Sequence, residues 1–243
     1  MTSITALGDS IAYGVGDVVQ RSPMSSWSGR LACAIQGQKH QRIAWPGARI
    51  EDVAKTQLSA VLVTRPDIVL LSIGGNDAVR RGFCPRNFSE QLHEVIEKLD
   101  RTSARVVLLN LQDVSRNCPI PAPIGKALAH RVGLLNTAIR ESISGTNAVI
   151  LDRWDDSTAY QNKYLSIDRV HPSPRGYQRL AESTAQLLGY EASQEQLDFE
   201  EENKRRSMWV ATKGIPWAIK RSTRLVPGFV SIIRQGSGTG NSH

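Results

Sequence analysis

Residues 68–77 read IVLLSIGGND, a run that is apolar except for one serine and ends directly in two glycines and a polar pair. A second run of the same kind, VVLLNL, occupies residues 106–111. Continuous apolar runs of this length are typical of central strands in a parallel sheet, because such strands are buried on both faces. The stretch therefore predicts a buried parallel strand that ends at a polar turn.

Three further apolar runs predict strands at Ile4–Leu7, Arg42–Ala44 and Ala148–Leu151. Helical periodicity separates the predicted strands, and Gly189 is expected to stop the last helix. This alternation predicts a doubly wound α/β fold with a central five-stranded parallel sheet and helices on both faces. The segments with helical periodicity are 26–36, 50–62, 88–100, 124–143 and 173–189.

The length suits one large domain, or one domain with an appendage, and the composition is ordinary for a soluble globular protein. The chain has 243 residues, of which 40% are apolar and 22% charged. It lacks the roughly 18 consecutive apolar residues of a membrane span and the basic-then-apolar pattern of a signal peptide, so we expect a cytoplasmic protein. Cys33, Cys84 and Cys118 lack the spacing of metal ligands and are expected to be thiols, and an approach of Cys84 to Cys118 stays open.

Ser10 lies directly after the first predicted strand, in LGDSIAYG (residues 7–14). A serine at this place suits a helix cap, a hydroxyl that binds phosphate, or a nucleophile. Doubly wound sheets bind ligands beyond the carboxyl ends of their strands. If Ser10 is catalytic, the residues that assist it should therefore also follow strands.

Such residues follow three other predicted strands. Gly47 lies in the turn WPGAR, Asn76 in GGND, and Asp168 precedes His171 in DRVHP. Each motif has a plainer interpretation: a turn before a helix, a turn held by polar side chains, or surface and capping residues. An acid three residues before a histidine can also orient the imidazole as a general base for a serine.

In combination, these motifs resemble the SGNH hydrolase family, also called GDSL esterases and lipases, over about residues 3–190. The resemblance implies a flavodoxin-like three-layer α/β/α fold, the SGNH hydrolase fold. It implies that Ser10 is the nucleophile, His171 the general base and Asp168 the orienting acid. It also implies an oxyanion hole formed by the backbone N–H groups of Ser10 and Gly47 and the side chain of Asn76.

This sequence departs from the family pattern in two places. GDSI replaces GDSL, which keeps an apolar side chain after Ser10. No asparagine occurs before Asn76, although the family often has one upstream of the glycine assigned here to Gly47. The GxSxG elbow of α/β-hydrolases is absent, which favours the flavodoxin-like arrangement.

The expected activity is hydrolysis of carboxylic esters through an acyl-serine intermediate, with no metal and no organic cofactor. An acyltransferase with the same triad and a non-catalytic binding protein on the same frame are the alternatives. The expected partner is a small-molecule or lipid ester whose acyl and alcohol groups the sequence does not specify. Four arginines near the predicted substrate loops suit either an anionic substrate or solvent-facing charge: Arg80, Arg81, Arg86 and Arg116.

Residues 1–190 are predicted to form the catalytic domain and residues 191–243 a basic, Trp-containing extension. From Asn203 to His243 the chain has eight Lys or Arg and no Asp or Glu, which leaves 22 basic and 23 acidic residues in 1–202. We expect a helix at the start of the extension and disorder over about its last eight residues. The extension is expected either to pack on the domain or to contact an anionic membrane; nucleic acid is not an expected partner.

Overall fold

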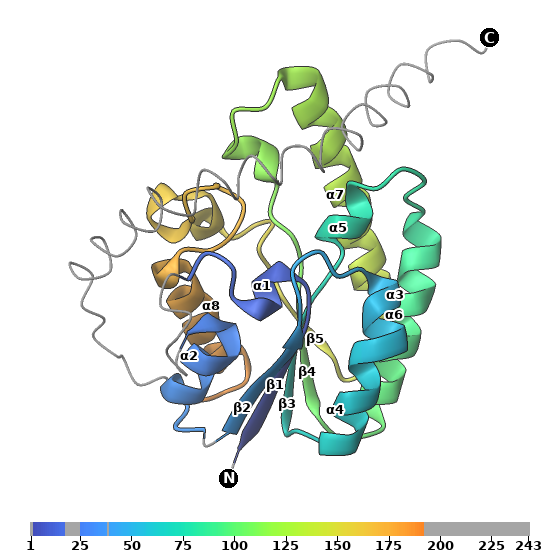
Figure 1. Cartoon of the computed structure of the whole chain (residues 1–243), viewed down its shortest axis with the longest axis vertical. Coiled ribbons are helices and arrows are strands. Elements are labelled where there is room, and N and C mark those ends of the chain that lie inside the picture. The colour runs from blue at the N-terminus through green and yellow to red at the C-terminus, as the bar shows by residue number, and fades with distance from the viewer. Residues whose placement is uncertain (1, 18–24, 38, 192–243) are drawn as a thin grey trace.

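The structure is a computed structural model that describes residues 2–17, 25–37 and 39–191. Its centre is a five-stranded parallel sheet with the strand order β2-β1-β3-β4-β5 (Figure 1). The order reverses direction between β1 and β3, so a ligand crevice is expected beyond the carboxyl ends of these two strands. The strands are β1 (Ser3–Gly8), β2 (Lys39–Ala44), β3 (Ile68–Ser72), β4 (Arg105–Leu109) and β5 (Val149–Leu151).

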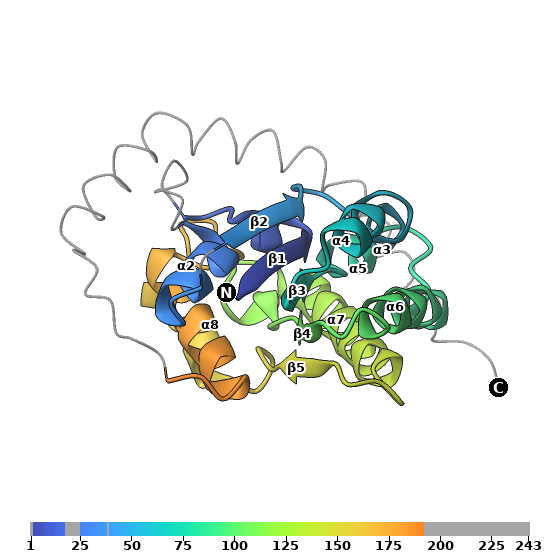
Figure 2. The same ribbon diagram turned by 90° about the horizontal axis from the view of Figure 1, so that it is seen from below.

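Helices cover both faces of the sheet, which gives three layers (Figure 2). On one face lie α2 (Ser26–Ala34) and α8 (Pro174–Leu187). On the other face lie α6 (Pro85–Asp100), α7 (Ala122–Ser142) and a helical run made of α3 (Ile50–Asp52), η1 (Val53–Gln57) and α4 (Leu58–Thr64). The short elements are α1 (Ser10–Tyr13), α5 (Gly75–Ala78), η2 (Val114–Arg116), η3 (Ser157–Tyr160) and η4 (Asn162–Tyr164).

The continuous apolar runs arise because alternate residues of one strand serve two cores. In β3, Leu70 packs into the core beneath α2 and α8, whereas Val69 and Leu71 pack into the core beneath α6 and α7. Successive side chains of a strand point to opposite faces, so a strand between two helical layers needs apolar residues throughout. The predicted three-layer fold is confirmed.

The observed elements begin and end within three residues of the predicted ones, and two of them also differ in local structure. The run predicted at 106–111 leaves the sheet after Leu109, because the Asn110 side chain donates to Asp152 Oδ1 and the Asn136 side chain bonds both backbone groups of Leu111. The helix predicted at 50–62 extends to Thr64 and contains a π-helical turn.

Helix α8 ends at Leu187, and Gly189 adopts the expected left-handed conformation, with φ +74°. In the described part of the chain, no helix is long and apolar enough to cross a membrane. The predictions about the basic extension concern residues that, from 192 onward, lie outside the described ranges.

Candidate active site

Ser10 lies at the carboxyl end of β1, where the chain turns from the sheet into α1. Its side chain is 5% exposed. Asp9 caps the helix by accepting a hydrogen bond from the Ile11 N–H at 3.0 Å, and the Asp9 N–H donates to the Ser72 carbonyl of β3 at 2.9 Å. The Ser10 N–H is in the first turn of α1, where backbone N–H groups have no partner within the helix. Ser10 thus presents a hydroxyl and a backbone donor at one place.

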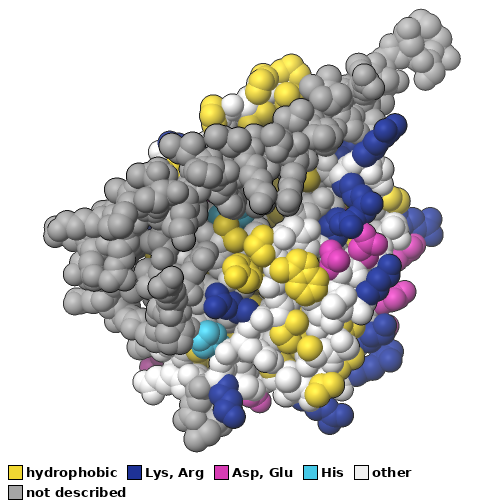
Figure 3. Space-filling model, viewed as in Figure 1, with side chains coloured by type: hydrophobic (Ala, Val, Ile, Leu, Met, Phe, Trp, Pro, Cys, Tyr) yellow, Lys and Arg dark blue, Asp and Glu magenta, His cyan; other side chains and the backbone are white. Residues whose placement is uncertain are grey.

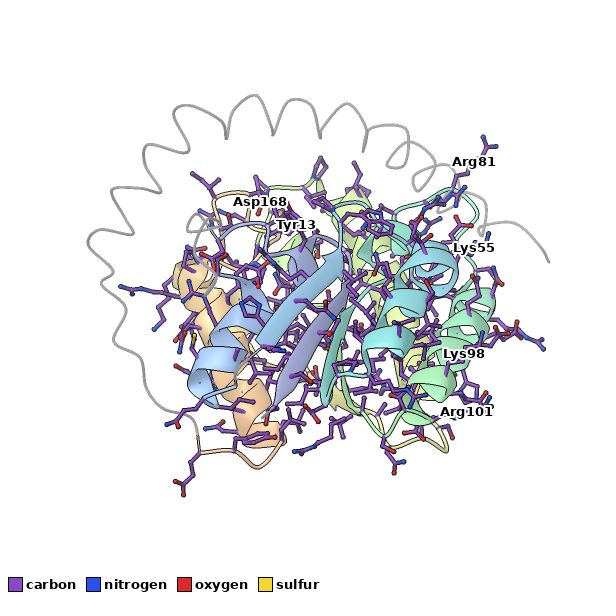
Figure 4. All side chains as sticks on the ribbon, turned by 60° about the horizontal axis from the view of Figure 1, so that its bottom comes forward. Tyr13, Lys55, Arg81, Lys98, Arg101 and Asp168 are labelled. Atoms are coloured by element: carbon purple, nitrogen blue, oxygen red, sulfur yellow. The ribbon has the colours of Figure 1, made fainter. Side chains whose placement is uncertain are left out.

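His171 and Asp168 come from the loop before α8 and meet Ser10. His171 Nε2 lies 2.7 Å from Ser10 Oγ, and His171 Nδ1 lies 2.6 Å from Asp168 Oδ2. The His171 side chain is almost fully buried, and Asp168 is 15% exposed. Tyr13 of α1 and Asp168 lie at the same end of the sheet (Figure 4). The structure therefore joins three residues from two distant segments in one hydrogen-bonded chain.

Hydrogen bonds keep the Asp168 carboxylate ionised. Asp168 Oδ1 accepts from the backbone N–H groups of Val170 and His171, each at 3.0 Å. Burial of the carboxyl acts to raise its pKa, but the His171 ring and these two N–H donors outweigh burial and hold the pKa below its usual value. A carboxylate fixed in this way can hold one tautomer of the imidazole and stabilise the imidazolium.

Asn76 lies in the short helix α5, beside the turn that contains Gly47. The Asn76 side-chain N–H donates to the carbonyl of Ala48, the residue after Gly47, at 2.9 Å. An amide nitrogen has two hydrogens, so Asn76 keeps a second donor. Gly47 is exposed and has φ +92°, a conformation that favours glycine. The neighbouring Asp77 accepts from the Ile50 N–H at 3.3 Å, which is a second hydrogen bond between α5 and the segment that follows Gly47.

Three residues around His171 are not among those predicted from the sequence. Gly16 has φ +100°, and a Cβ there would lie 2.4 Å from the Pro172 carbonyl oxygen and 3.2 Å from His171 Cβ. Gln112 donates to the carbonyl of Val170 at 3.4 Å and accepts from the buried guanidinium of Arg153 at 3.0 Å. A second glycine six residues after Ser10 was the available signal for Gly16, whereas Gln112 and Arg153 show no sequence pattern.

The arginines near the loops mostly have partners in the protein. Arg80 pairs with Glu51 at 3.3 Å and Arg86 with Glu90 at 2.9 Å. Arg116 lies over the Tyr160 ring, 3.6 Å from its centre. These contacts account for three of the four arginines without an anionic substrate.

Cys84 and Cys118 do not form a disulfide. Cys118 lies beside the loop that carries Asp168 and His171, with Sγ 3.8 Å from the Asp168 carbonyl oxygen and 3.7 Å from that of Arg169. Burial, together with the Asp168 charge, raises the pKa of the Cys118 thiol. The approach of Cys84 to Cys118 that the sequence left open therefore does not produce a disulfide.

Asp77 should make the stability of the protein fall with rising pH. Burial raises the pKa of this carboxyl to about 6, and the Asp9 charge adds to the effect. The folded state therefore holds a proton that the unfolded state releases, and stability is lost as the pH rises from about 4 to about 6. Asp77→Asn keeps the acceptor for the Ile50 N–H and cannot ionise. We therefore expect its free energy of unfolding to fall less than that of wild type between low and neutral pH, by up to about 2–3 kcal/mol. Urea unfolding at about pH 4.5 and pH 7.5 measures it.

Asp67→Asn is the control for the sign of this effect. The pKa of Asp67 is lowered, chiefly by the backbone N–H of Ser3 and then by the Ser3 hydroxyl. Its carboxylate therefore stabilises the fold at higher pH and loses that effect as the pH falls. If Asp77→Asn and wild type show the same pH dependence, Asp77 is not protonated in the folded protein.

Comparisons with known proteins agree with the fold and with the family that the sequence resembles. A model of the GDSL-like lipase/acylhydrolase family matches residues 6–179. The spore germination lipase LipC of Bacillus licheniformis is 24% identical over 205 residues, which are 73% of this chain and 92% of that protein. A crystal structure of a lipase/acylhydrolase from Enterococcus faecalis has 24% identity and a TM-score of 0.61, over 81% of this chain and 100% of that one. An α/β hydrolase from the Lake Arreo metagenome has 19% identity and a TM-score of 0.63, over 79% and 97%.

Proposed function

The chain belongs to the GDSL-like lipase/acylhydrolase family and is a hydrolase of ester bonds, and we propose that it cleaves carboxylic esters through an acyl-serine intermediate. The observation that supports this mechanism is the continuous chain of contacts from Ser10 Oγ through His171 to Asp168, at 2.7 and 2.6 Å. A serine hydroxyl is a weak nucleophile unless a base takes its proton during attack. His171 Nε2 is at the right distance to do so.

In the proposed reaction, Ser10 Oγ attacks the ester carbonyl carbon while its proton moves to His171 Nε2. The tetrahedral intermediate collapses as His171 returns the proton to the leaving alcohol oxygen. Water then attacks the acyl-serine while His171 takes a proton from it, and His171 returns that proton to Ser10 Oγ as the carboxylic acid leaves. Asp168 accepts the Nδ1–H of His171 throughout and stabilises the imidazolium that forms in each half.

We propose that three donors stabilise the negative charge on the oxygen of each tetrahedral intermediate: the backbone N–H groups of Ser10 and Gly47 and the second side-chain N–H of Asn76. Fixed donors of this kind stabilise charge that develops only in the transition state. The hydrogen bond from Asn76 to the Ala48 carbonyl supports the assignment, because it holds the Asn76 amide beside the Gly47 turn.

Asn76→Ala should lower kcat by about 10²–10³-fold and leave KM within about threefold of wild type, because the lost donor acts on the transition state. Steady-state hydrolysis of a p-nitrophenyl ester measures this. The variant also loses the bond to Ala48, so its thermal unfolding is recorded in parallel. A folded Asn76→Ala protein with the wild-type kcat would remove Asn76 from the proposed oxyanion hole.

A panel of p-nitrophenyl esters from acetate to octanoate tests the proposed function and defines the acyl group. Three exposed apolar residues lie within three residues, along the sequence, of proposed site residues: Tyr13, Trp45 and Ile167. Hydrophobic side chains also gather near the centre of the face that carries α1 (Figure 3). We propose that this apolar surface favours the binding of esters with acyl groups longer than acetyl. A folded chain that hydrolyses no ester and gives no acyl-enzyme in mass spectrometry would contradict the proposal.

The acyltransferase alternative uses the same acyl-serine and differs only in the acceptor. Addition of alcohols to the ester assay separates the two, since a transferase forms a new ester in place of the acid. A cytoplasmic location and a membrane contact through residues 191–243 stay proposals that rest on the sequence.

A further inference from the structure

The helical run over residues 50–64 contains a π-helical turn, Val53–Gln57. π-turns are rare in proteins and often occur at functional sites. The residues of this run that face the protein interior are apolar except for one, Gln57, which has no exposed surface. The apolar ones are Ile50, Val53, Leu58 and Val61. A buried amide among apolar side chains requires partners for both of its ends.

Both ends of the Gln57 carboxamide bond a single residue, Gly8. The Gly8 N–H donates to Gln57 Oε1 at 2.6 Å, and Gln57 Nε2 donates to the Gly8 carbonyl at 3.0 Å. All four groups are buried. The side chain of Gln57 thus binds the backbone of Gly8 much as a neighbouring strand would.

Gly8 is the point from which the Ser10 turn departs. It is the last residue of β1, two positions before Ser10, and has φ +118°. Its carbonyl also accepts from the N–H of Trp45 at 3.3 Å, two residues before Gly47. The orientation of this backbone unit therefore affects both the Ser10 hydroxyl and the chain that leads to the Gly47 N–H.

We propose that Gln57 is a positioning residue for the Ser10 turn, an inference that rests on the proposed function of Ser10 as nucleophile. Gln57 fixes the Gly8 backbone and thereby places Ser10 Oγ against His171 Nε2. An apolar side chain of similar size would suit a position with no exposed surface equally well. It would leave the Gly8 N–H and carbonyl without these partners and free the turn to shift.

Two variants test the proposal. Gln57→Met keeps the length of the side chain and removes both hydrogen bonds. Gln57→Glu replaces the amide by a carboxyl group that, when protonated, can still accept from the Gly8 N–H and donate to the Gly8 carbonyl. Burial among apolar residues favours the protonated form of that carboxyl. The matched control is Thr184→Val, in the layer on the opposite face of the sheet. It also deletes two buried hydrogen bonds of one side chain, from Trp27 Nε1 at 2.8 Å and to the Leu180 carbonyl at 2.6 Å.

The readouts are the rate of Ser10 labelling by a fluorophosphonate, kcat and KM for a p-nitrophenyl ester, and thermal unfolding. Gln57→Met should slow labelling and kcat by about 10–100-fold well below its unfolding temperature, because small displacements of a reacting group have effects of this size. KM should stay within about threefold. Thr184→Val should lower the unfolding temperature and keep the labelling rate within about twofold of wild type.

Gln57→Glu should approach the wild-type labelling rate at about pH 5 and fall toward the rate of Gln57→Met as the pH rises, because ionisation removes the donor. Each rate is divided by the wild-type rate at the same pH, so that the titration of the triad cancels. A purely structural role would lower stability without this pH-dependent ratio. A folded Gln57→Met protein that is labelled at the wild-type rate overturns the proposal, as does a Gln57→Glu protein whose ratio stays at the Gln57→Met value over the whole pH range.

Failure of the proposed function is recognised separately, by the absence of labelling in the wild-type protein. Hydrogen exchange of the peptide that spans residues 7–12 then carries the test, since it needs no activity. Gln57→Met should accelerate exchange in this peptide relative to both wild type and Thr184→Val. Equal exchange in all three proteins overturns the positioning role, whatever the function of Ser10.

Discussion

Ser10→Ala should abolish ester hydrolysis and leave the protein folded. The substitution removes the oxygen that carries the acyl group in the proposed mechanism, so kcat is expected to fall by about 10⁴-fold or more. The residual rate would come from the donors that remain around the substrate. Ser10 Oγ contacts His171 Nε2, and alanine is well tolerated in a helix, so the stability change should stay within about 1 kcal/mol.

Ser142→Ala is the matched control. Ser142 is 1% exposed, and its hydroxyl donates to the Ile139 carbonyl at 2.8 Å near the end of α7. It should keep the ester hydrolysis rate within about twofold of wild type, because serine hydroxyls away from a site affect stability more than rate. Fluorophosphonate labelling of wild type and Ser142→Ala, together with its loss in Ser10→Ala, would assign the modified residue. Hydrolysis that survives in purified Ser10→Ala would exclude Ser10 as the nucleophile.

The sequence predicts the sheet because burial of a strand on both faces requires apolar residues along its whole length. In IVLLSI and VVLLNL successive side chains alternate between the two cores on either side of the sheet. Burial on both faces therefore gives a nearly continuous apolar run. The polar residues at strand ends are visible for a related reason. Ser10, Asn76 and the Asp168–His171 pair interrupt apolar or helical patterns at points where a parallel sheet brings chain segments together.

The residues that support the site are not visible in the same way. Within a helical pattern, a polar residue such as Gln57 is predicted to lie on the surface. In the structure it lies in the π-turn and is buried, and its side chain bonds the backbone of Gly8, which is distant in the sequence. Helical periodicity records which side chains are apolar, not the hydrogen-bond register of the turn. Likewise, Gln112 and Arg153 are polar residues that become buried through contacts with each other and with the His171 loop.

Gly8→Ala should cause a large loss of stability. A Cβ at Gly8 would lie 1.9 Å from the Ser72 carbonyl oxygen and 2.8 Å from its carbon, both in the backbone of β3. These atoms belong to the central strand and cannot rotate away as a side chain can. The contact adds to the cost of φ +118° for a residue with a side chain. Together we expect about 3–5 kcal/mol, out of the 5–15 kcal/mol typical of whole proteins.

Gly145→Ala separates the two causes. Gly145 also has a positive φ, +76°, but a Cβ there would meet no atom within 4 Å. It should therefore cost about 1 kcal/mol, the backbone part alone. Urea unfolding of both variants at one pH gives the difference, which belongs to the contact with Ser72. Equal losses would mean that the end of β1 can move away from β3 at little cost.

Movement of this kind would have a second consequence that can be measured. Any displacement that relieves the contact with Ser72 also strains the two buried hydrogen bonds between Gly8 and Gln57. The folded fraction of Gly8→Ala should then be labelled at Ser10 more slowly than wild type, even after correction for unfolded protein. Gly145→Ala should keep the wild-type labelling rate. A glycine at position 8 thus suits both the close approach of two strands and the placement of the proposed nucleophile, because one backbone conformation satisfies both.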